Sequence, residues 1–448
     1  MDTASAHLNL LSDLIARARR LGADAADAVL VDSASLSVSY RLGALERLDR
    51  SEGGDIGLRV FFGRRQAIAS SSDRGAAALE DLVNRVVAMA RVVPEDPYCG
   101  LADPGELASN LAALDIHDPA EPTAETLITK AREAESAGRS VPGVTNSDGA
   151  SASWGRSSVA LAASNGFAHA YSTSGSSLSA SVIAGNDADG LERDYDYTSA
   201  VYFSDLRSPE DIGLAAGTRA VARLGARKVK TQSVPVVYDE RVARSLVSHL
   251  LGAINGASVA RGTTFLKDRL GQAVFAPGVT IVDDPHRRRG PSSRPCDGEG
   301  VANRRRNLVE NGVLTTWLLD LRSARQLGLR TTGHAARGIS SPPSPSATNV
   351  HLEAGQLSPA QLMADIRQGF YITELFGMGV NGITGDYSLG AAGRWIENGV
   401  PAYPVHEVTV AGNLVEMFRH LTPANDLALR FGTESPTVRV DGMTVAGR

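Results

Sequence analysis

The stretch that decides the fold runs from residue 157 to residue 172 and reads SSVALAASNGFAHAYS. Asn165-Gly166, near its centre, is the dipeptide best suited to a type I′ turn, because both central residues of that turn need positive φ. Ser157 to Ala163 and Phe167 to Ser172, on either side, alternate as strands do. We therefore predict an antiparallel hairpin in the first half of the chain.

Further strands and helices are predicted around this hairpin. The strands are expected at Asp27 to Asp32, Ser35 to Tyr40, Asp55 to Phe62 and Gln66 to Ser71, separated by Gly43 and by a turn at Gly53-Gly54. Apolar residues recur at helical spacing over residues 8–21 and 79–87, and a helix capped by Ser208 stops at Gly225. We expect this last helix to close an N-terminal α/β domain, residues 1–225, built from a mixed sheet and helices.

The second half, residues 226–448, is predicted to be rich in strands. It begins with a polar linker, Ala226 to Ser233, and a helix around Val242 to Ile254. Asn311-Gly312, Asn398-Gly399 and Asp441-Gly442 then give three hairpin signals. These signals predict a mainly antiparallel, barrel- or sandwich-like C-terminal domain, so the fold class is α+β.

Composition and charge exclude several classes of protein. The 448 residues include 45 Lys or Arg and 50 Asp or Glu, and the net charge of −5 argues against a chain that coats nucleic acid or anionic membrane. Two cysteines, Cys99 and Cys296, are too few for a disulfide framework, which favours a reducing cytoplasm. Because the sequence has no long uncharged apolar stretch, we expect a soluble, cytoplasmic protein that binds no membrane.

The glycine-rich stretch Gly377 to Gly382 matches G-x-G-x-x-G, the spacing of dinucleotide-binding turns. Such a turn must follow a strand and open a helix. Here the preceding run, Leu362 to Leu375, has helical spacing, and Thr384-Gly385-Asp386 follows in place of a helix. The stretch therefore predicts a structural loop and no nucleotide site.

Catalytic and metal motifs are absent or incomplete in this sequence. His406-Glu407 is the only His-Glu pair, and it lacks a second histidine at the spacing of a zinc helix. His249, His286 and His334 are dispersed, so we expect them to be hydrogen-bonded and not to bind metal. Ser388 misses the G-x-S-x-G spacing of a nucleophile turn by one residue.

A cysteine and an arginine-rich segment each allow a catalytic or binding activity as an alternative. Cys296 lies near His286, Asp297 and Glu299, so a thiol nucleophile is an alternative, although a buried and inert cysteine is the simpler interpretation. The segment from Asp283 to Arg306 carries seven arginines against four acids and could bind phosphates or an acidic partner, or form a solvated loop.

A series of motifs in the second half has a recognisable order. It reads VDDP at 282–285, SRP at 293–295, NGVL at 311–314, GMGVN at 377–381, GDYSLGAAG at 385–393, WIENG at 395–399, YPV at 403–405, AGNL at 411–414 and GMTVAG at 442–447. This series resembles the TldD/PmbA family, specifically its PmbA (TldE) branch. The resemblance implies a two-part zinc peptidase of the prokaryotic cytoplasm, which cuts leader segments from ribosomally made peptides and degrades small unfolded proteins. The family is also called a modulator of DNA gyrase.

In that family a TldD-type subunit carries an H-E-x-x-x-H zinc helix, and a TldE-type subunit pairs with it. The corresponding stretch here reads LVSHLLGA at 246–253, so Ser248 stands at the first ligand, His249 at the glutamate and Ala253 at the second ligand. The resemblance therefore implies that this chain has no catalytic residue, no metal ligand and no cofactor of its own, and that the zinc belongs to the partner subunit.

By the same resemblance, the residues expected to contact the peptide or the partner are Asp386, Tyr387, Ser388, Asn398 and Tyr403. The expected partners are a TldD-type catalytic subunit and an extended peptide. A homodimer of the isolated chain is a further option, and nucleic acid is not expected to bind. Two alternatives remain at this point: an autonomous metallo- or cysteine peptidase that uses dispersed residues, and a regulator that binds gyrase or nucleic acid through the arginine-rich segment.

Overall fold

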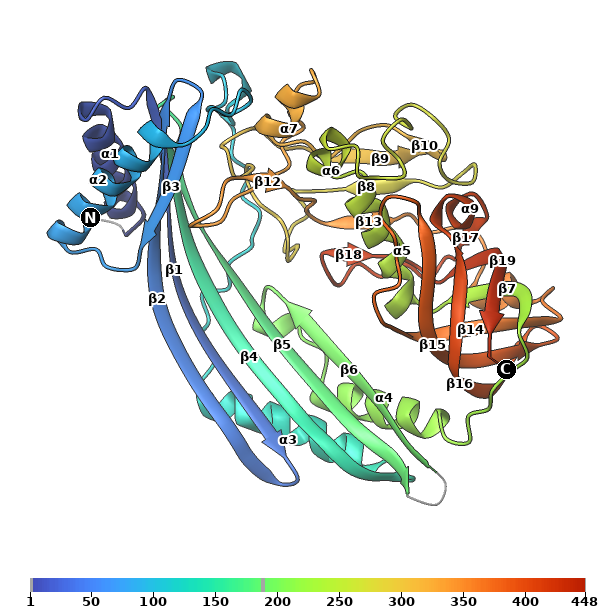
Figure 1. Ribbon diagram of the computed structural model, residues 1–448. Coiled ribbons are helices and arrows are strands. Elements are labelled where there is room, and N and C mark those ends of the chain that lie inside the picture. The colour runs from blue at the N-terminus through green and yellow to red at the C-terminus, as the bar shows by residue number, and fades with distance from the viewer. Residues whose placement is uncertain (1–2, 187–189, 448) are drawn as a thin grey trace.

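A long, curved antiparallel sheet dominates the first half of the computed structural model, which describes residues 3–186 and 190–447 (Figure 1). Its strand order is β3-β2-β1-β4-β5-β6. The bounds are β1 (Ala25–Arg41), β2 (Ala44–Phe62), β3 (Arg65–Ser71), β4 (Val144–Ala163), β5 (Ala168–Asn186) and β6 (Gly190–Ala200). All pairings among these strands are antiparallel, so the expectation of a mixed sheet in this half is wrong.

The strands of this sheet are longer than expected. β1 has 17 residues, where the sequence suggested two short strands, and β2 has 19, where it suggested one, Asp55 to Phe62. The expected turn at Gly53-Gly54 does not form, because both glycines stay in the ladder and pair with Ser33 and Asp32. A glycine pair forms a turn only where its backbone leaves the extended conformation. Here the pairing with β1 keeps the backbone of Gly53 and Gly54 extended.

The predicted hairpin joins β4 to β5, with Asn165-Gly166 in the connection. Its turn is not type I′, because Gly166 has φ of 97° but Asn165 is not in the positive-φ region. Instead, the Asn165 side-chain oxygen accepts a hydrogen bond from the backbone N–H of Phe167 at 3.2 Å. The hairpin is therefore confirmed and the turn type is corrected.

Four helices cover one face of the long sheet. Alternate residues of β1 are buried under these helices. Near the start of the strand, Ala26, Ala28 and Leu30 pack against α1 (Thr3–Arg20) and α2 (Ala76–Val92). Further along the same face, Leu36 and Val38 pack against α3 (Ala124–Ser140) and α4 (Pro209–Ala222). The C-terminal half contacts the opposite face of the sheet in two places (Figure 1). Cys296 packs against Val29 and Leu161 at one of them, and Phe431 stacks on Tyr197 of β6 at the other. The serine side chains between them are exposed or half-buried. Two short 3-10 turns lie in the connections, η1 (Pro104–Glu106) and η2 (Phe203–Asp205).

A closed five-stranded barrel forms the centre of the second half and confirms the barrel-like expectation. Its order is β16-β15-β14-β7-β19, and a β16–β19 pairing closes it. The barrel strands are β7 (Gln232–Tyr238), β14 (Gln368–Phe376), β15 (Asp386–Glu397), β16 (Val400–Asn413) and β19 (Val438–Ala446), with β17 (Leu421–Pro423) beside β19. The β14–β7 pair is parallel and the other barrel pairs are antiparallel. The α+β class is confirmed.

Smaller elements surround the barrel. A second sheet has the order β10-β9-β8-β13-β18, with a separate pair of β11 and β12. These strands are β8 (Ile281–Asp283), β9 (Arg306–Glu310), β10 (Val313–Leu314), β11 (Ala335–Ala336), β12 (Ser344–Pro345), β13 (Val350–Leu352) and β18 (Thr433–Glu434). The helices are α5 (Glu240–Ala253), α6 (Gly256–Ala260), α7 (Leu321–Gln326), α8 (Pro359–Met363) and α9 (Leu414–Arg419). Among the described residues, no helix is long and apolar enough to cross a membrane.

The hairpin signals of the second half have different outcomes. Asn311-Gly312 and Asn398-Gly399 turn between β9 and β10 and between β15 and β16, and all four residues have positive φ. Asp441-Gly442 instead lies inside β19 as a bulge, because β19 pairs with β7 on both sides of it. The expected boundary at residues 225 and 226 lies between α4 and β7 and stays a prediction.

The run before the glycine-rich stretch is also corrected. Helix α8 ends at Met363, and the residues expected to continue it form strand β14, in which Phe370 and Ile372 point into the barrel core. Since β15 follows the glycine-rich loop where a nucleotide-binding turn needs a helix, the exclusion of a dinucleotide site still holds.

Candidate functional site

Helix α5 lies where the resemblance places the metal helix. Asp239 caps its first turn by accepting the Arg241 N–H at 3.0 Å, and Leu246, Val247 and Leu250 bury its apolar face. Ser248, on the exposed side, donates its hydroxyl to the Arg244 carbonyl at 3.1 Å. The helix geometry is thus retained independently of any metal.

The residues at the ligand positions do not fit a zinc ion. His249 lies edge-on to the ring of Tyr387, with 5.9 Å between ring centroids, and burial lowers its pKa, which favours the neutral imidazole at pH 7. Ser248 and Ala253 supply no metal ligand. Across residues 3–186 and 190–447, no group of three or more His, Cys, Asp and Glu residues is placed to hold a metal ion.

A cavity of ≈ 450 Å³, the α5 hollow, lies beside this helix. Its walls are formed by Ser248 to Ala253, by Ser258 to Phe265 and by the glycine-rich loop. Met378 stands on that loop with 99% of its surface exposed. Apart from the imidazole of His249, these walls are apolar or carry hydroxyl groups, so the hollow suits an apolar side chain and has no carboxylate to activate water.

The glycine-rich loop folds back onto the start of β15. The Ser388 N–H donates to the Gly379 carbonyl at 2.7 Å, and a Cβ built on Gly379 would lie 1.8 Å from the Ser388 carbonyl oxygen. Asp386 accepts hydrogen bonds from Thr384 at 2.6 Å and from Asn413 at 3.1 Å. The glycines therefore allow a close approach of two backbone segments.

The five predicted contact residues do not form one site. Asp386, Tyr387 and Ser388 lie at one end of β15, whereas Asn398 and Tyr403 lie beyond its other end, after a strand of 12 residues. Tyr387 is 1% exposed, and burial raises its pKa to about 12. Asn398 holds the turn at φ 50°, and the Tyr403 ring lies under the guanidinium of Arg227 at 4.7 Å. Their role as contacts stays a prediction.

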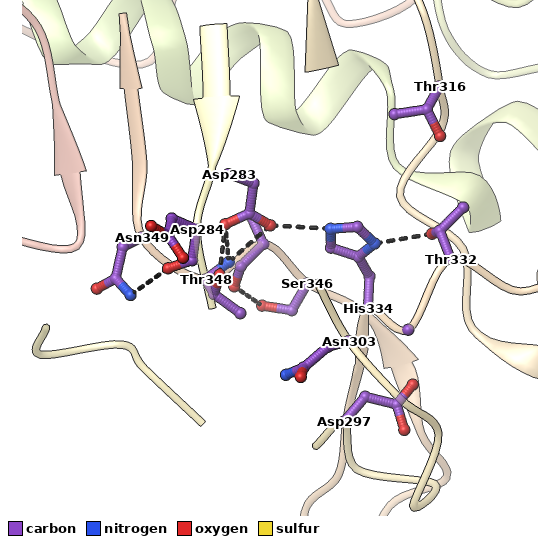
Figure 2. A network of polar contacts seen from close by, with 12 residues as sticks. Asp283, Asp284, Asp297, Asn303, Thr316, Thr332, His334, Ser346, Thr348 and Asn349 are labelled. Carbon is purple, nitrogen blue, oxygen red and sulfur yellow. Dashed lines mark hydrogen bonds and ion pairs between the residues drawn. The ribbon is translucent and has the colours of Figure 1, made fainter. Parts of the chain in front are cut away.

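A buried acid–imidazole–hydroxyl series lies elsewhere in the second half, and sequence reasoning missed it (Figure 2). The Asp283 carboxylate is 2.8 Å from His334 Nε2, and His334 Nδ1 is 2.7 Å from Thr332 Oγ1. Asp283 also accepts the Thr348 N–H at 3.0 Å and the Thr348 hydroxyl. The order of groups is that of a nucleophilic triad.

The surroundings of this series argue for a structural role. Thr332 is 8% exposed, and its hydroxyl oxygen already accepts the Leu319 N–H at 2.8 Å and lies 3.3 Å from two backbone carbonyls. Asp283 is 0% and His334 4% exposed. The series connects β8 to the loops around His334 and Thr348. These two residues lie 51 and 65 positions after Asp283 in the chain. No pattern of short spacing could have revealed it.

Cys296 and the arginine-rich segment are both held within the structure. Cys296 is 4% exposed, and burial raises its pKa to about 12, so it is a thiol and not a nucleophilic thiolate. His286 pairs with Asn303 at 2.7 Å. Arg289 forms ion pairs with Asp115 at 2.8 Å and Asp205 at 3.0 Å, which neutralise its charge. These contacts weaken the cysteine-peptidase and nucleic-acid alternatives.

The face of the long sheet that the helices leave uncovered carries rows of hydroxyl groups, and we call it the hydroxyl face. One row runs across four strands: Ser37 pairs with Ser153, Ser153 with Ser177 and Ser177 with Ser199. A neighbouring row runs from Ser39 through Ser151 to Ser179. These side chains are exposed or half-buried. Rows repeat about every 6.6–7 Å along a strand, the side-chain period of an extended peptide.

Comparisons with known proteins cover nearly the whole chain. Residues 26–90, 117–224 and 231–447 match the sequence profiles of domain 1, the central domain and the C-terminal domain of the PmbA/TldA metallopeptidases. The chain is 38% identical to "Metalloprotease PmbA" of Escherichia coli O157:H7, over 99% of this chain and 97% of the relative. It is 35% identical to "Metalloprotease PmbA homolog" of Haemophilus influenzae, over 96% of this chain and 94% of the relative.

Solved structures show the same architecture. A crystal structure from Bacteroides thetaiotaomicron, described as a modulator of DNA gyrase, has a TM-score of 0.90 at 27% identity and covers 98% of both chains. TldE from Thermococcus kodakarensis has a TM-score of 0.87 at 19% identity, with 98% of this chain and 100% of that chain covered, and shows the likeness of fold alone.

Proposed function

The chain belongs to the PmbA/TldA metallopeptidase family, and within that family we propose that it is the non-catalytic, PmbA/TldE-type subunit of a heteromeric zinc peptidase. A TldD-type partner would supply the zinc and the water-activating carboxylate. The observation that carries this proposal is α5, which keeps the helix but places Ser248, His249 and Ala253 at the positions that a zinc helix fills with ligands and base.

The substrate proposed for the complex is an extended peptide, either a leader segment or an unfolded chain. Hydroxyl groups both donate and accept hydrogen bonds, so the hydroxyl face can pair with main-chain groups whatever the peptide sequence. The α5 hollow would take an apolar side chain of the peptide or of the partner. Asp386, Ser388, Asn398 and Tyr403 are retained as proposed contacts, and Tyr387 would act indirectly by holding His249.

We place the complex in the cytoplasm, which agrees with the unpaired state of Cys99 and Cys296. No metal is proposed for this chain. The chemistry of bond cleavage, activation of water by zinc, would take place entirely on the partner subunit.

The test is reconstitution with the TldD-type subunit. The purified chain should bind less than stoichiometric zinc and should not cleave an unstructured peptide, whereas the two-subunit mixture should cleave it and lose activity with a chelator. A mixture containing a partner whose zinc histidines are replaced is the matched control. Chelator-sensitive cleavage by this chain alone, or one zinc per isolated chain, would contradict the proposal.

A further inference from the structure

A second cavity, of ≈ 370 Å³, lies where the hydroxyl face meets the C-terminal half. One wall is formed by β4 and β5, including Leu161, His169 and Tyr171, and the other by two loops that supply Arg294, Cys296 and Arg337. The volume falls in the range of about 300–1,000 Å³ that small-molecule sites occupy. The cavity is separate from the α5 hollow and from the series of Asp283, His334 and Thr332, although Asp297, also drawn in Figure 2, lines it.

Arg337 places an under-paired guanidinium behind the wall of this cavity. Its side chain is only 2% exposed, and Nη1 is 2.6 Å from an oxygen of Asp27. Among the described residues, Nε and Nη2 of Arg337 have no hydrogen-bond acceptor, and all three guanidinium nitrogens are buried, so its charge acts on the cavity from behind the wall. Asp27 is shared, because Arg59 donates to both of its oxygens from Nε at 3.1 Å. One buried carboxylate therefore faces two buried guanidinium groups.

Arg294 adds a second cation without a carboxylate partner in the described part of the chain. Its two terminal nitrogens donate to the carbonyls of Ala335 and Ala347, each at 3.3 Å. Long hydrogen bonds to neutral carbonyls leave its charge uncompensated. Arg294 and Arg337 thus approach one cavity from two loops.

The nearby acids restore the balance only in part. Both oxygens of Asp297 accept backbone N–H groups, from Glu299 and Val301 at 2.9 Å and from Ala335 at 3.1 Å. Burial raises the pKa of Asp297 to about 6, so this carboxylate stays ionised at pH 7, whereas burial together with repulsion from Asp297 raises the pKa of Glu299 to about 8. Arg59, Arg294 and Arg337 therefore outnumber the ionised Asp27 and Asp297, and the cavity carries excess positive charge.

We propose that this cavity is a carboxylate-binding site, in which the Arg294 guanidinium clamps the two oxygens of a carboxylate while Leu161, Tyr171 and Cys296 enclose its apolar stem. The buried charge of Arg337 adds attraction from behind the wall. A planar guanidinium matches a carboxylate with two parallel hydrogen bonds, which gives the site its selectivity over neutral groups.

The carboxylate has two possible sources. Thr173 lines the cavity and pairs with Ser157, which pairs with Ser33, so a further hydroxyl row of the same face begins at the cavity. A peptide extended on that face would place its C-terminal carboxylate in the cavity, and this source rests on the proposed function. A free small carboxylic acid is the other source.

Calorimetric titration of the isolated full chain tests the site. The probes are N-acetylated tetra-alanine with a free C-terminal carboxylate, the same peptide as a C-terminal amide, and acetate. Charge-assisted hydrogen bonds to the clamp should make the free acid bind about tenfold or more tightly than the amide. Acetate binding as tightly as the peptide acid would assign the site to small acids, and tighter binding of the peptide would assign it to peptide ends.

Variants sharpen the result. Arg294→Gln should abolish the preference for the acid, whereas Arg156→Gln, an exposed position on β4 outside the cavity, should preserve it. Equal binding of acid and amide, or no binding of acid, amide and acetate to the unaltered chain, would overturn the proposal without any variant. An unchanged preference in Arg294→Gln would overturn the clamp. Because no partner subunit is present, these outcomes are separate from failure of peptide cleavage by the reconstituted mixture.

Discussion

Replacing Asp27 by Asn removes the single buried carboxylate that Arg59 and Arg337 share. The side chains of the three residues are 3%, 4% and 2% exposed. Asparagine keeps the shape of the side chain but removes the negative charge, so two buried guanidinium groups lose their counter-ion. Breaking a buried ion pair by removing one partner costs about 3–5 kcal/mol, and we expect Asp27→Asn to lose that amount.

Urea denaturation at pH 7 measures the loss. With an m-value of about 2–3 kcal/mol/M, the midpoint should fall by about 1–2 M. The control is Asp13→Asn, which removes a surface partner of Arg17 with both side chains about 40% exposed, and a change of no more than about 0.5 kcal/mol is expected there. A loss below about 1 kcal/mol in Asp27→Asn would refute the electrostatic argument.

The pH dependence gives an independent check. Burial alone would raise the pKa of Asp27, but attraction by Arg337 and Arg59 outweighs it and lowers the pKa below its ordinary value. The stabilisation is therefore complete above the unfolded pKa of about 4 and is lost as the pH falls through the lower folded value. Asp27→Asn should show a weaker decline of stability below about pH 4 than the unaltered chain.

Three further predictions concern the glycine-rich loop, the buried network and the free thiol. Gly379→Ala should lower the unfolding temperature by several degrees, because its Cβ would meet the Ser388 carbonyl at 1.8 Å, whereas Gly382→Ala, with nothing within 4 Å, should not; equal effects would contradict the contact. His334→Gln should cost about 1–3 kcal/mol in urea denaturation and leave cleavage by the reconstituted complex intact; lost cleavage at unchanged stability would make the series with Asp283 catalytic. Cys296, with its pKa raised to about 12, should resist iodoacetamide at pH 8 until urea unfolds the chain, and rapid labelling of the folded protein would show an accessible thiolate.

Local signals in the sequence predicted local structure well. Asn398-Gly399 and Asn311-Gly312 turn where expected because Asn and Gly adopt positive φ at low cost, and Asn165-Gly166 also turns, although only its glycine has positive φ. Gly53-Gly54 and Asp441-Gly442 carry similar composition but remain within strands, since pairing with β1 and with β7 decides their conformation. The outcome in these cases depends on partners far away in the chain.

In the candidate site, too, features set by local sequence could be predicted and features set by distant parts of the chain could not. The missing zinc ligands on α5 could be predicted, because the spacing of a metal motif lies within one helix. The hydroxyl face could not be, since its rows depend on the register among four strands and a one-residue shift would turn every serine to the helix-covered side. The two arginines of the second cavity were equally hidden, because Arg294 and Arg337 come from loops 43 positions apart and meet only in the folded chain.

The two halves of the molecule contribute complementary chemistry to the proposed peptide site. In this proposal, serine hydroxyls on the long sheet, which hold no net charge, would bind any main chain and so supply affinity without selecting a sequence or an end. The buried guanidinium groups have the opposite property, since they cost free energy to desolvate and regain it only from an anion. A peptide bound along both would be fixed in direction by its carboxylate and left free in sequence, which is the selectivity that a non-catalytic subunit can add to a zinc centre on its partner.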